Sequence, residues 1–156
     1  MDRNEHVAPT PDSGRVLVAG STGYVGRRLV PELVAAGWQV RCMARRPEEL
    51  DSERWRDSVE VVGGDVMDPA SLADAFEGVT AAYYLIHSIG VGDDWRERDR
   101  RAAANFAQAA AVSGTRQIVY LGGLGDEQAG ELSPHLESRH EVGRELAGSG
   151  VPVTEL

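Results

Sequence analysis

Hydrophobic residues along the chain fall into two alternating patterns. Short continuous apolar runs predict β-strands, and longer stretches with apolar residues three and four apart predict helices. The predicted strands span residues 15–20, 38–44, 59–65, 80–88 and 116–123, and a sixth begins at residue 151. Because strands with continuous apolar runs are buried on both faces, this alternation predicts a parallel sheet with helices on both sides.

The first predicted helix follows the first strand closely. Apolar side chains recur at helical spacing from Tyr24 to Ala36, and Gly37 ends the pattern. Pro31 lies inside this helix, where it removes a backbone hydrogen bond and is expected to bend the axis. Further helices are predicted over residues 68–76, 94–112 and 133–147, and residues 47–57 are expected to form a short polar helix or a loop.

Capping residues indicate where the later helices begin. Asp68 and Ser133 are each followed by a proline at the first helical position, a common helix start. Asp94 is expected to cap the longest helix, with Glu97 three residues later as in a capping box.

The order of these elements limits the topology of the sheet. Right-handed crossovers leave few arrangements, and the natural one is the doubly wound α/β order 3-2-1-4-5-6. In that order the ligand crevice lies at the carboxyl ends of strands one and four. We expect a flexible leader over residues 1–14 and one domain over residues 15–156.

Composition excludes several classes of function. The chain has 156 residues, 42% hydrophobic, with a formal net charge of −9, which argues against a nucleic-acid partner. No stretch is apolar enough to span a membrane, and the N-terminal residues lack a signal peptide's apolar core. The lone cysteine, Cys42, lies in an apolar run and is expected to be a core residue. Because the sequence shows neither a signal peptide nor a pair of cysteines, we expect a cytoplasmic protein.

Three glycines between the first strand and the first helix have the spacing of a phosphate-binding loop. Gly20, Gly23 and Gly26 form the pattern G-x-x-G-x-x-G in "AGSTGYVG". In such loops one glycine permits a tight turn, another lets the backbone approach a pyrophosphate, and a third lets the helix pack closely on the strand. Because the loop follows a predicted strand and opens a predicted helix, a dinucleotide site is favoured over a plain turn.

This loop and three further blocks resemble one enzyme family. "GSTGYVG", "GDVMDPASLADAFEGV", "AAANFAQAAAVSGTRQIVYLGGLG" and "SGVPVTEL" are similar, in this order, to the atypical and extended short-chain dehydrogenases/reductases, including the NmrA-like NAD(P)-binding proteins. The resemblance implies a Rossmann-type fold. It also implies that the C-terminal substrate lobe is absent, so we expect the chain to be the cofactor-binding part of a longer protein.

The resemblance also assigns residues to the cofactor. The three glycines would line the pyrophosphate, and their neighbours Ser21, Thr22, Tyr24 and Val25 would contact it. Asp65 and Val66 would flank the adenine. Ile86, His87 and Ser88, at the end of strand four, would lie beside the nicotinamide-side ribose.

The end of the second strand indicates which dinucleotide is preferred. NAD-binding domains usually carry an acidic residue here that accepts the ribose hydroxyls, but Ala44 takes that position, followed by Arg45 and Arg46. Two guanidinium groups suit a 2′-phosphate, so NADP(H) is preferred over NAD(H), which is not excluded. The alternative is that one or both arginines belong to a solvated turn.

The catalytic residues of the resembled family are replaced in this chain. Its Tyr-x-x-x-Lys pair would lie on the helix that begins at Ser133, where the spacing of the family pattern places His135 and Arg139. Gly122 and Gly123 stand where a Ser or Thr usually ends strand five. His135 could act as general acid or base and Arg139 could bind ribose or phosphate, or both could assist binding alone.

Two hypotheses follow, with a third that is weaker. The first is an NADP(H)-dependent oxidoreductase acting on a small organic substrate when complete, and the second is a non-catalytic NADP(H) sensor or scaffold. A nucleotide-sugar epimerase or dehydratase is weaker because it needs the Tyr–Lys pair. No metal-ligand spacing is evident, and the open edge of the sixth strand leaves a homo-oligomer as an expectation.

Overall fold

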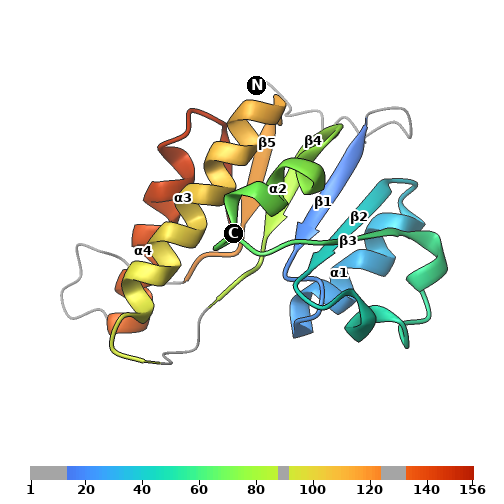
Figure 1. Ribbon diagram of the computed structural model, residues 1–156, viewed down its shortest axis with the longest axis horizontal. Coiled ribbons are helices and arrows are strands. Elements are labelled where there is room, and N and C mark those ends of the chain that lie inside the picture. The colour runs from blue at the N-terminus through green and yellow to red at the C-terminus, as the bar shows by residue number, and fades with distance from the viewer. Residues whose placement is uncertain (1–13, 88–91, 124–132) are drawn as a thin grey trace, which may run out of the picture.

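The computed structural model describes residues 14–87, 92–123 and 133–156, which contain one six-stranded parallel sheet with its helices (Figure 1). The strands are β1 (Arg15–Ala19), β2 (Gln39–Ala44), β3 (Glu60–Gly63), β4 (Val79–Tyr84), β5 (Gln117–Tyr120) and β6 (Val153–Glu155). Their order is β3-β2-β1-β4-β5-β6, so the predicted α/β class and topology are confirmed. Most of the predicted leader lies outside the described residues.

The helices lie close to their predicted positions. They are α1 (Tyr24–Ala35), α2 (Pro69–Phe76), α3 (Trp95–Ser113) and α4 (Pro134–Ala147), with short 3-10 turns η1 (Pro47–Leu50) and η2 (Arg56–Ser58) in the segment left open as helix or loop. Helix α1 continues through Pro31 and ends before Gly37, whose φ is +88°. Among the described residues, no helix is long and apolar enough to cross a membrane.

Two of the three predicted caps form. The side chains of Asp68 and Ser133 accept hydrogen bonds from the N–H groups of Ala70 and Leu136. The prediction for Asp94 is wrong, because its backbone (φ −109°, ψ 15°) is not in the extended conformation from which a cap side chain reaches back to the first turn. Glu97 instead contacts Arg100, 3.3 Å away.

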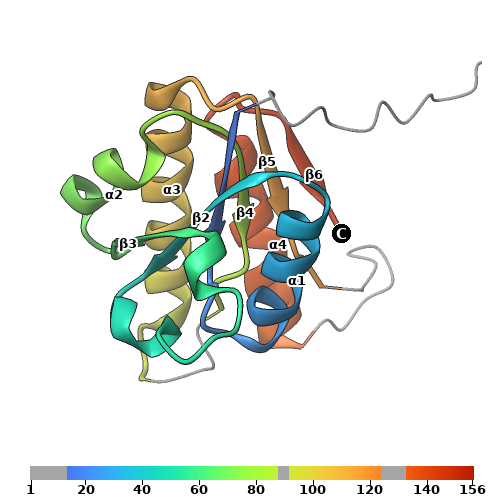
Figure 2. The ribbon, with the colours of Figure 1, turned by 90° about the vertical axis from the view of Figure 1, so that its right-hand side faces the viewer.

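Helices cover both faces of the sheet, as predicted. Figure 2 shows α2 and α3 on one side of the strands and α1 on the other. One core lies under α2, α3 and α4, where Phe76, Tyr84 and Phe106 form edge-on ring contacts. The other core lies under α1 and the 3-10 turns and includes Cys42 and Trp55. Because the strands pair in parallel, the carboxyl ends of β1–β4 lie at one edge of the sheet.

The fourth and fifth strands are shorter than predicted at this edge. The predicted strand over residues 80–88 ends at Tyr84, although the N–H of Leu85 still donates to the Ala19 carbonyl, 2.9 Å away. The strand predicted over residues 116–123 ends at Tyr120. At Gly20 the chain turns out of β1 toward α1, so β1 offers no hydrogen-bond partner to the chain that continues from β4 beyond Leu85. The two chain segments separate from this point. The separation opens the predicted crevice between β1 and β4.

Candidate functional site

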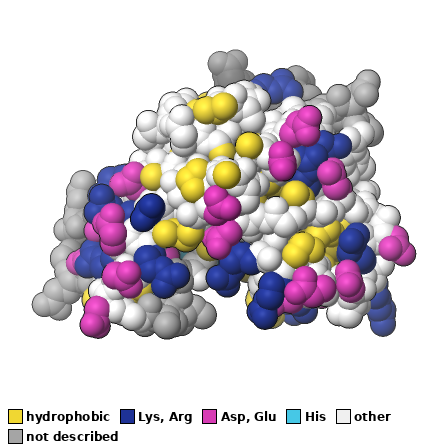
Figure 3. All heavy atoms as spheres, viewed as in Figure 1, with side chains coloured by type: hydrophobic (Ala, Val, Ile, Leu, Met, Phe, Trp, Pro, Cys, Tyr) yellow, Lys and Arg dark blue, Asp and Glu magenta, His cyan; other side chains and the backbone are white. Residues whose placement is uncertain are grey.

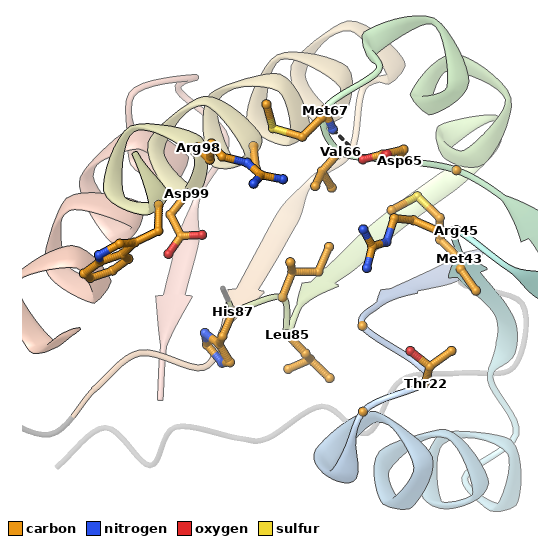
Figure 4. A pocket seen from close by; sticks show the side chains of 17 residues that line it. Thr22, Met43, Arg45, Asp65, Val66, Met67, Leu85, His87, Arg98 and Asp99 are labelled. Carbon is orange, nitrogen blue, oxygen red and sulfur yellow. Dashed lines mark hydrogen bonds between the residues drawn. The ribbon is translucent and has the colours of Figure 1, made fainter. Parts of the chain in front are cut away.

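A cavity of about 570 Å³ lies at the carboxyl ends of strands β1–β4. Its walls come from the loop between β1 and α1, the ends of β2, β3 and β4, and the first two turns of α3 (Figure 4). The lining residues are Gly20, Thr22, Gly23, Met43, Ala44, Arg45, Gly64, Asp65, Val66, Met67, Leu85, Ile86, His87, Trp95, Arg98, Asp99 and Ala102. Eight of the predicted cofactor residues are among them: Gly20, Thr22, Gly23, Arg45, Asp65, Val66, Ile86 and His87.

The glycine loop has the geometry that its spacing predicts. Gly20 has φ +95°, and a Cβ there would lie 2.9 Å from the Leu85 backbone. The N–H of Gly23 donates to the Gly20 carbonyl, 3.1 Å away, which closes the tight turn. A Cβ on Gly26 would lie 2.3 Å from the same carbonyl oxygen, so a glycine there allows α1 to pack against the loop. Gly20 and Gly26 are therefore each required by a close backbone contact, and Gly23 lines the cavity.

Helix α1 begins at this cavity without a side-chain cap. Gly23 is its N-cap and supplies no side chain, and the first turn carries no acidic residue. The first N–H groups of a helix have no partner within the helix, and the helix dipole favours negative charge beside them. This end of α1 therefore fits a phosphate group.

Four predicted loop residues do not line the cavity. The buried Ser21 donates its hydroxyl to the Met43 carbonyl, 3.1 Å away, and so ties the loop to β2. Tyr24 is exposed, with the Arg28 guanidinium 3.6 Å above its ring centre. Val25 is also exposed, and Gly26 packs against the loop.

The two adjacent arginines have different environments. Arg45 lines the cavity and has no carboxylate partner within the described part of the chain. Arg46 lies outside the lining and forms an ion pair with Glu49 of η1. Ala44 places no carboxylate at the end of β2, so a phosphate beside Arg45 would meet no negative charge from that position.

The two residues predicted to flank the adenine are held by a network of hydrogen bonds. The Asp65 carboxylate accepts the N–H of Met67, 2.8 Å away, and the Ser71 hydroxyl bonds the Asp65 backbone. The Asn105 side chain, from α3, donates to the Val66 carbonyl, 2.8 Å away. The loop after β3 is thus fixed in place at the cavity wall. Ser88, also predicted as a cofactor residue, lies outside the described residues.

A second cavity, of about 220 Å³, adjoins the first and contains both predicted catalytic residues. Its lining residues are Ile86, His87, Trp95, Asp99, Tyr120, His135, Ser138, Arg139 and Val142, and the first four also line the larger cavity. The His135 ring lies 5.0 Å from the Trp95 ring, between centres. The Arg139 guanidinium donates to the Gly122 carbonyl, 3.2 Å away. A ligand in one cavity would therefore meet a ligand in the other beside His87 and Asp99.

Ionisable groups at this junction have altered proton affinities. Desolvation by neighbouring atoms lowers the pKa of the exposed His87, the Arg139 guanidinium lowers it further, and the Asp99 carboxylate opposes both effects. The His87 imidazole is therefore neutral at pH 7. Burial raises the pKa of Tyr120, whose hydroxyl donates to the Arg139 carbonyl, 3.0 Å away. The phenol thus stays protonated, and it is already bonded to the backbone.

Lysine is absent from the whole sequence, and all 16 basic residues are arginines. The Tyr-x-x-x-Lys pair therefore has no equivalent in this chain. Within the described residues no group of three or more His, Cys, Asp or Glu side chains is placed to hold a metal ion. Burial raises the pKa of Cys42 to about 12, which fits the core residue that was predicted and not a nucleophile.

Helix α3 contributes four of the nine lining residues that were not predicted as cofactor residues from the sequence. Trp95, Arg98, Asp99 and Ala102 follow one another at intervals of three, one and three residues, so they share one face of the helix. That spacing is a usable signal, because residues three and four apart lie on the same side of a helix. The face becomes part of the site because the first turns of α3 line the same cavity as Leu85, Ile86 and His87, which follow β4.

Comparisons with known proteins agree with this geometry. A family model described as NAD(P)H-binding matches residues 20–154. The (4-alkanoyl-5-oxo-2,5-dihydrofuran-3-yl)methyl phosphate reductase of Streptomyces griseus is 36% identical over 139 residues, covering 89% of this chain and 45% of that protein. The chloroplastic divinyl chlorophyllide a 8-vinyl-reductase of Zea mays is 40% identical over 121 residues, covering 70% of this chain and 30% of that protein.

The fold also matches solved structures. The triphenylmethane reductase of Citrobacter sp., complexed with NADP(H), superposes with a TM-score of 0.74 at 24% identity, covering 90% of this chain and 48% of that one. The chain spans less than half the length of each of these three proteins.

Proposed function

Because the chain belongs to the NAD(P)H-binding family of atypical short-chain dehydrogenase/reductase-like Rossmann proteins, we propose that it forms the NADP(H)-binding half of a reductase acting on a small organic substrate. The observation that carries this proposal is the cavity at the carboxyl ends of β1–β4, bounded by the glycine loop on one side and Arg45 on another. The curated relatives that share the family are reductases and other oxidoreductases.

The residues around the cavity fit a dinucleotide from end to end. The uncapped start of α1 would hold the pyrophosphate through its free N–H groups. Gly23, which lines the cavity and has no Cβ, would let the phosphates approach the backbone. Asp65 and Val66 would flank the adenine, and Ile86 and His87 would lie beside the nicotinamide-side ribose. Bound there, a nicotinamide dinucleotide would supply or accept a hydride.

The preference for NADP(H) rests on Arg45. Its guanidinium lines the cavity without a carboxylate partner in the described structure, and Ala44 leaves no acidic side chain at the end of β2 to repel a phosphate. A guanidinium binds phosphate through paired, charge-assisted hydrogen bonds. Arg46, engaged with Glu49, has no part in this proposal.

The substrate is proposed to enter the smaller cavity. His135 and Arg139 line it, and His87 and Asp99 lie where it meets the larger one. We keep His135 as the candidate proton donor or acceptor and Arg139 as a positioning residue that orients the end of β5 through Gly122. The names of the relatives do not share one substrate, so the substrate class is left at a small organic molecule.

The non-catalytic sensor is the less favoured alternative, since the relatives are named as reductases. Turnover of NADPH by the complete protein, lost on His135→Ala, would separate the two. A cytoplasmic location and a homo-oligomer stay part of the proposal. The location is supported by the presence of one cysteine, which excludes an internal disulfide.

A side-by-side thermal titration tests the cofactor assignment. At 100 times its Kd, a ligand adds about 2.7 kcal/mol to the free energy of unfolding. NADP⁺ at such an excess should raise the melting temperature by roughly 5–10 °C, and NAD⁺ should need a higher concentration for the same rise. No rise with either dinucleotide at millimolar concentration would refute the proposal.

A further inference from the structure

Arg98 projects into the larger cavity from α3 and has not been assigned a role by family resemblance. It lies on the cavity-facing side of the helix, one turn after Trp95. Figure 4 shows its guanidinium pointing away from α3 toward Arg45, whose guanidinium points back from the end of β2. In the space-filling view, basic side chains lie beside the hollow between the two halves of the surface (Figure 3). Two cations therefore face each other across one cavity.

Two other arginines of the same helix pair with carboxylates, whereas Arg98 does not pair with any that the structure describes. On the same helix, Arg96 lies 2.7 Å from Glu141, and Arg100 lies 3.4 Å from Glu145. In a chain with 25 acidic and 16 basic residues, carboxylates are abundant. Arg98 and Arg45 nevertheless form no ion pair with any carboxylate that the structure describes.

The two carboxylates that line the cavity accept hydrogen bonds from neutral groups and not from either arginine. Asp65 accepts the N–H of Met67, and Asp99 accepts the Ser138 hydroxyl at 3.5 Å. Two like charges facing one another repel, and an anion between them removes that repulsion. The cavity therefore has a place for one compact, multiply charged anion between its two walls.

We propose that Arg98 and Arg45 bind the 2′-phosphate of NADP(H) from opposite sides, so that Arg98 is a second determinant of cofactor specificity. This inference rests on the proposed dinucleotide site and adds a residue from α3 to it. A phosphate dianion offers enough acceptor oxygens for two guanidinium forks at once. NAD(H) lacks that phosphate and would leave both arginines without a partner.

Calorimetric titration of Arg98→Gln with NADP⁺ and NAD⁺ tests the inference. We expect at least a tenfold loss of NADP⁺ affinity and less than a twofold change for NAD⁺. Adenosine 2′,5′-bisphosphate should lose affinity like NADP⁺, and 5′-AMP should not. Arg101→Gln is the matched control, because Arg101 is an exposed arginine of the same helix outside the cavity lining, and it should bind both dinucleotides as the wild type does.

Three outcomes would overturn the inference. Equal losses for NADP⁺ and NAD⁺ would place Arg98 on the pyrophosphate, and unchanged affinity for both would show that it makes no contact. A wild-type chain that binds neither dinucleotide would refute the proposed function itself, and the inference with it. The unliganded melting temperature of Arg98→Gln, expected to equal that of Arg101→Gln, shows whether the variant is folded.

Discussion

A Cβ on Gly26 would lie 2.3 Å from the carbonyl oxygen of Gly20, so the first turn of α1 and the loop that precedes it touch through bare backbone. Gly26→Ala must therefore displace the loop or the helix. Overpacking of this kind costs about 1–3 kcal/mol. We expect a melting temperature lowered by roughly 2–4 °C for each kcal/mol, measured by circular dichroism, together with weaker dinucleotide binding.

Gly23→Ala is the matched variant within the same loop. A Cβ there would lie 3.4 Å from the Gly20 carbonyl oxygen, an ordinary contact, and the φ of −80° suits alanine. We expect the melting temperature to change little while NADP⁺ affinity falls at least tenfold, because Gly23 lines the cavity where phosphates would approach. Equal effects of the two substitutions on stability would contradict these distinct roles.

Arg45 and Arg46 should respond differently to truncation. Hydrogen bonds to a charged group contribute about 1.5–3 kcal/mol, so Arg45→Ala should weaken NADP⁺ binding at least tenfold and leave NAD⁺ binding nearly unchanged. Arg46→Ala removes an exposed ion pair with Glu49 and should change neither. Calorimetric titration of both variants with both dinucleotides measures these affinities. If Arg45→Ala still preferred NADP⁺ over NAD⁺, Arg45 could not be the cause of that preference.

The imidazole of His87 should titrate below its ordinary pKa of 6.5. Desolvation lowers this pKa, with Arg139 lowering it further and Asp99 raising it, so the two charges can be tested separately. Arg139→Gln should move the pKa upward, and Asp99→Asn should move it downward. Histidine ring proton shifts followed by NMR against pH measure both, and shifts in the same direction would contradict the account of this junction.

Arg41 fastens the end of α2 to the sheet. Its buried Nη1 lies 3.1, 2.8 and 2.8 Å from the carbonyl oxygens of Asp74, Ala75 and Glu77. Arg41→Met leaves these acceptors without their donor, and we expect a loss of about 3 kcal/mol in the free energy of unfolding by urea denaturation. Arg54→Met, at an exposed position, should cost less than about 0.5 kcal/mol.

The sheet order and the glycine loop could be predicted from the sequence because both depend on local patterns. Apolar runs, helix spacing and chain order suffice for the topology, and the roles of Gly20 and Gly26 follow from a turn and a close approach between residues near in sequence. Cap prediction was less secure: Asp68 and Asp94 have the same side chain, but only the extended backbone of Asp68 lets it reach the first turn.

The part of the site that depends on tertiary packing could not be predicted. The spacing of residues along the chain does not show that Arg46 pairs with Glu49 while Arg45 lines the cavity, nor that Arg98 lines it too. Each of these depends on which carboxylates lie nearby in space. The approach of α3 to the ends of β3 and β4, fixed in part by Asn105 and Val66, decides which face of that helix meets the cavity.

The most direct test of a dinucleotide site in this cavity is energy transfer from Trp95, which lines it, to bound NADPH. On excitation of tryptophan, we predict NADPH emission that rises to saturation, falls when excess NADP⁺ is added, and is much reduced in Trp95→Phe, in which Trp38 and Trp55 remain. Emission that only grows linearly with NADPH, up to millimolar concentration and without competition by NADP⁺, would contradict the account.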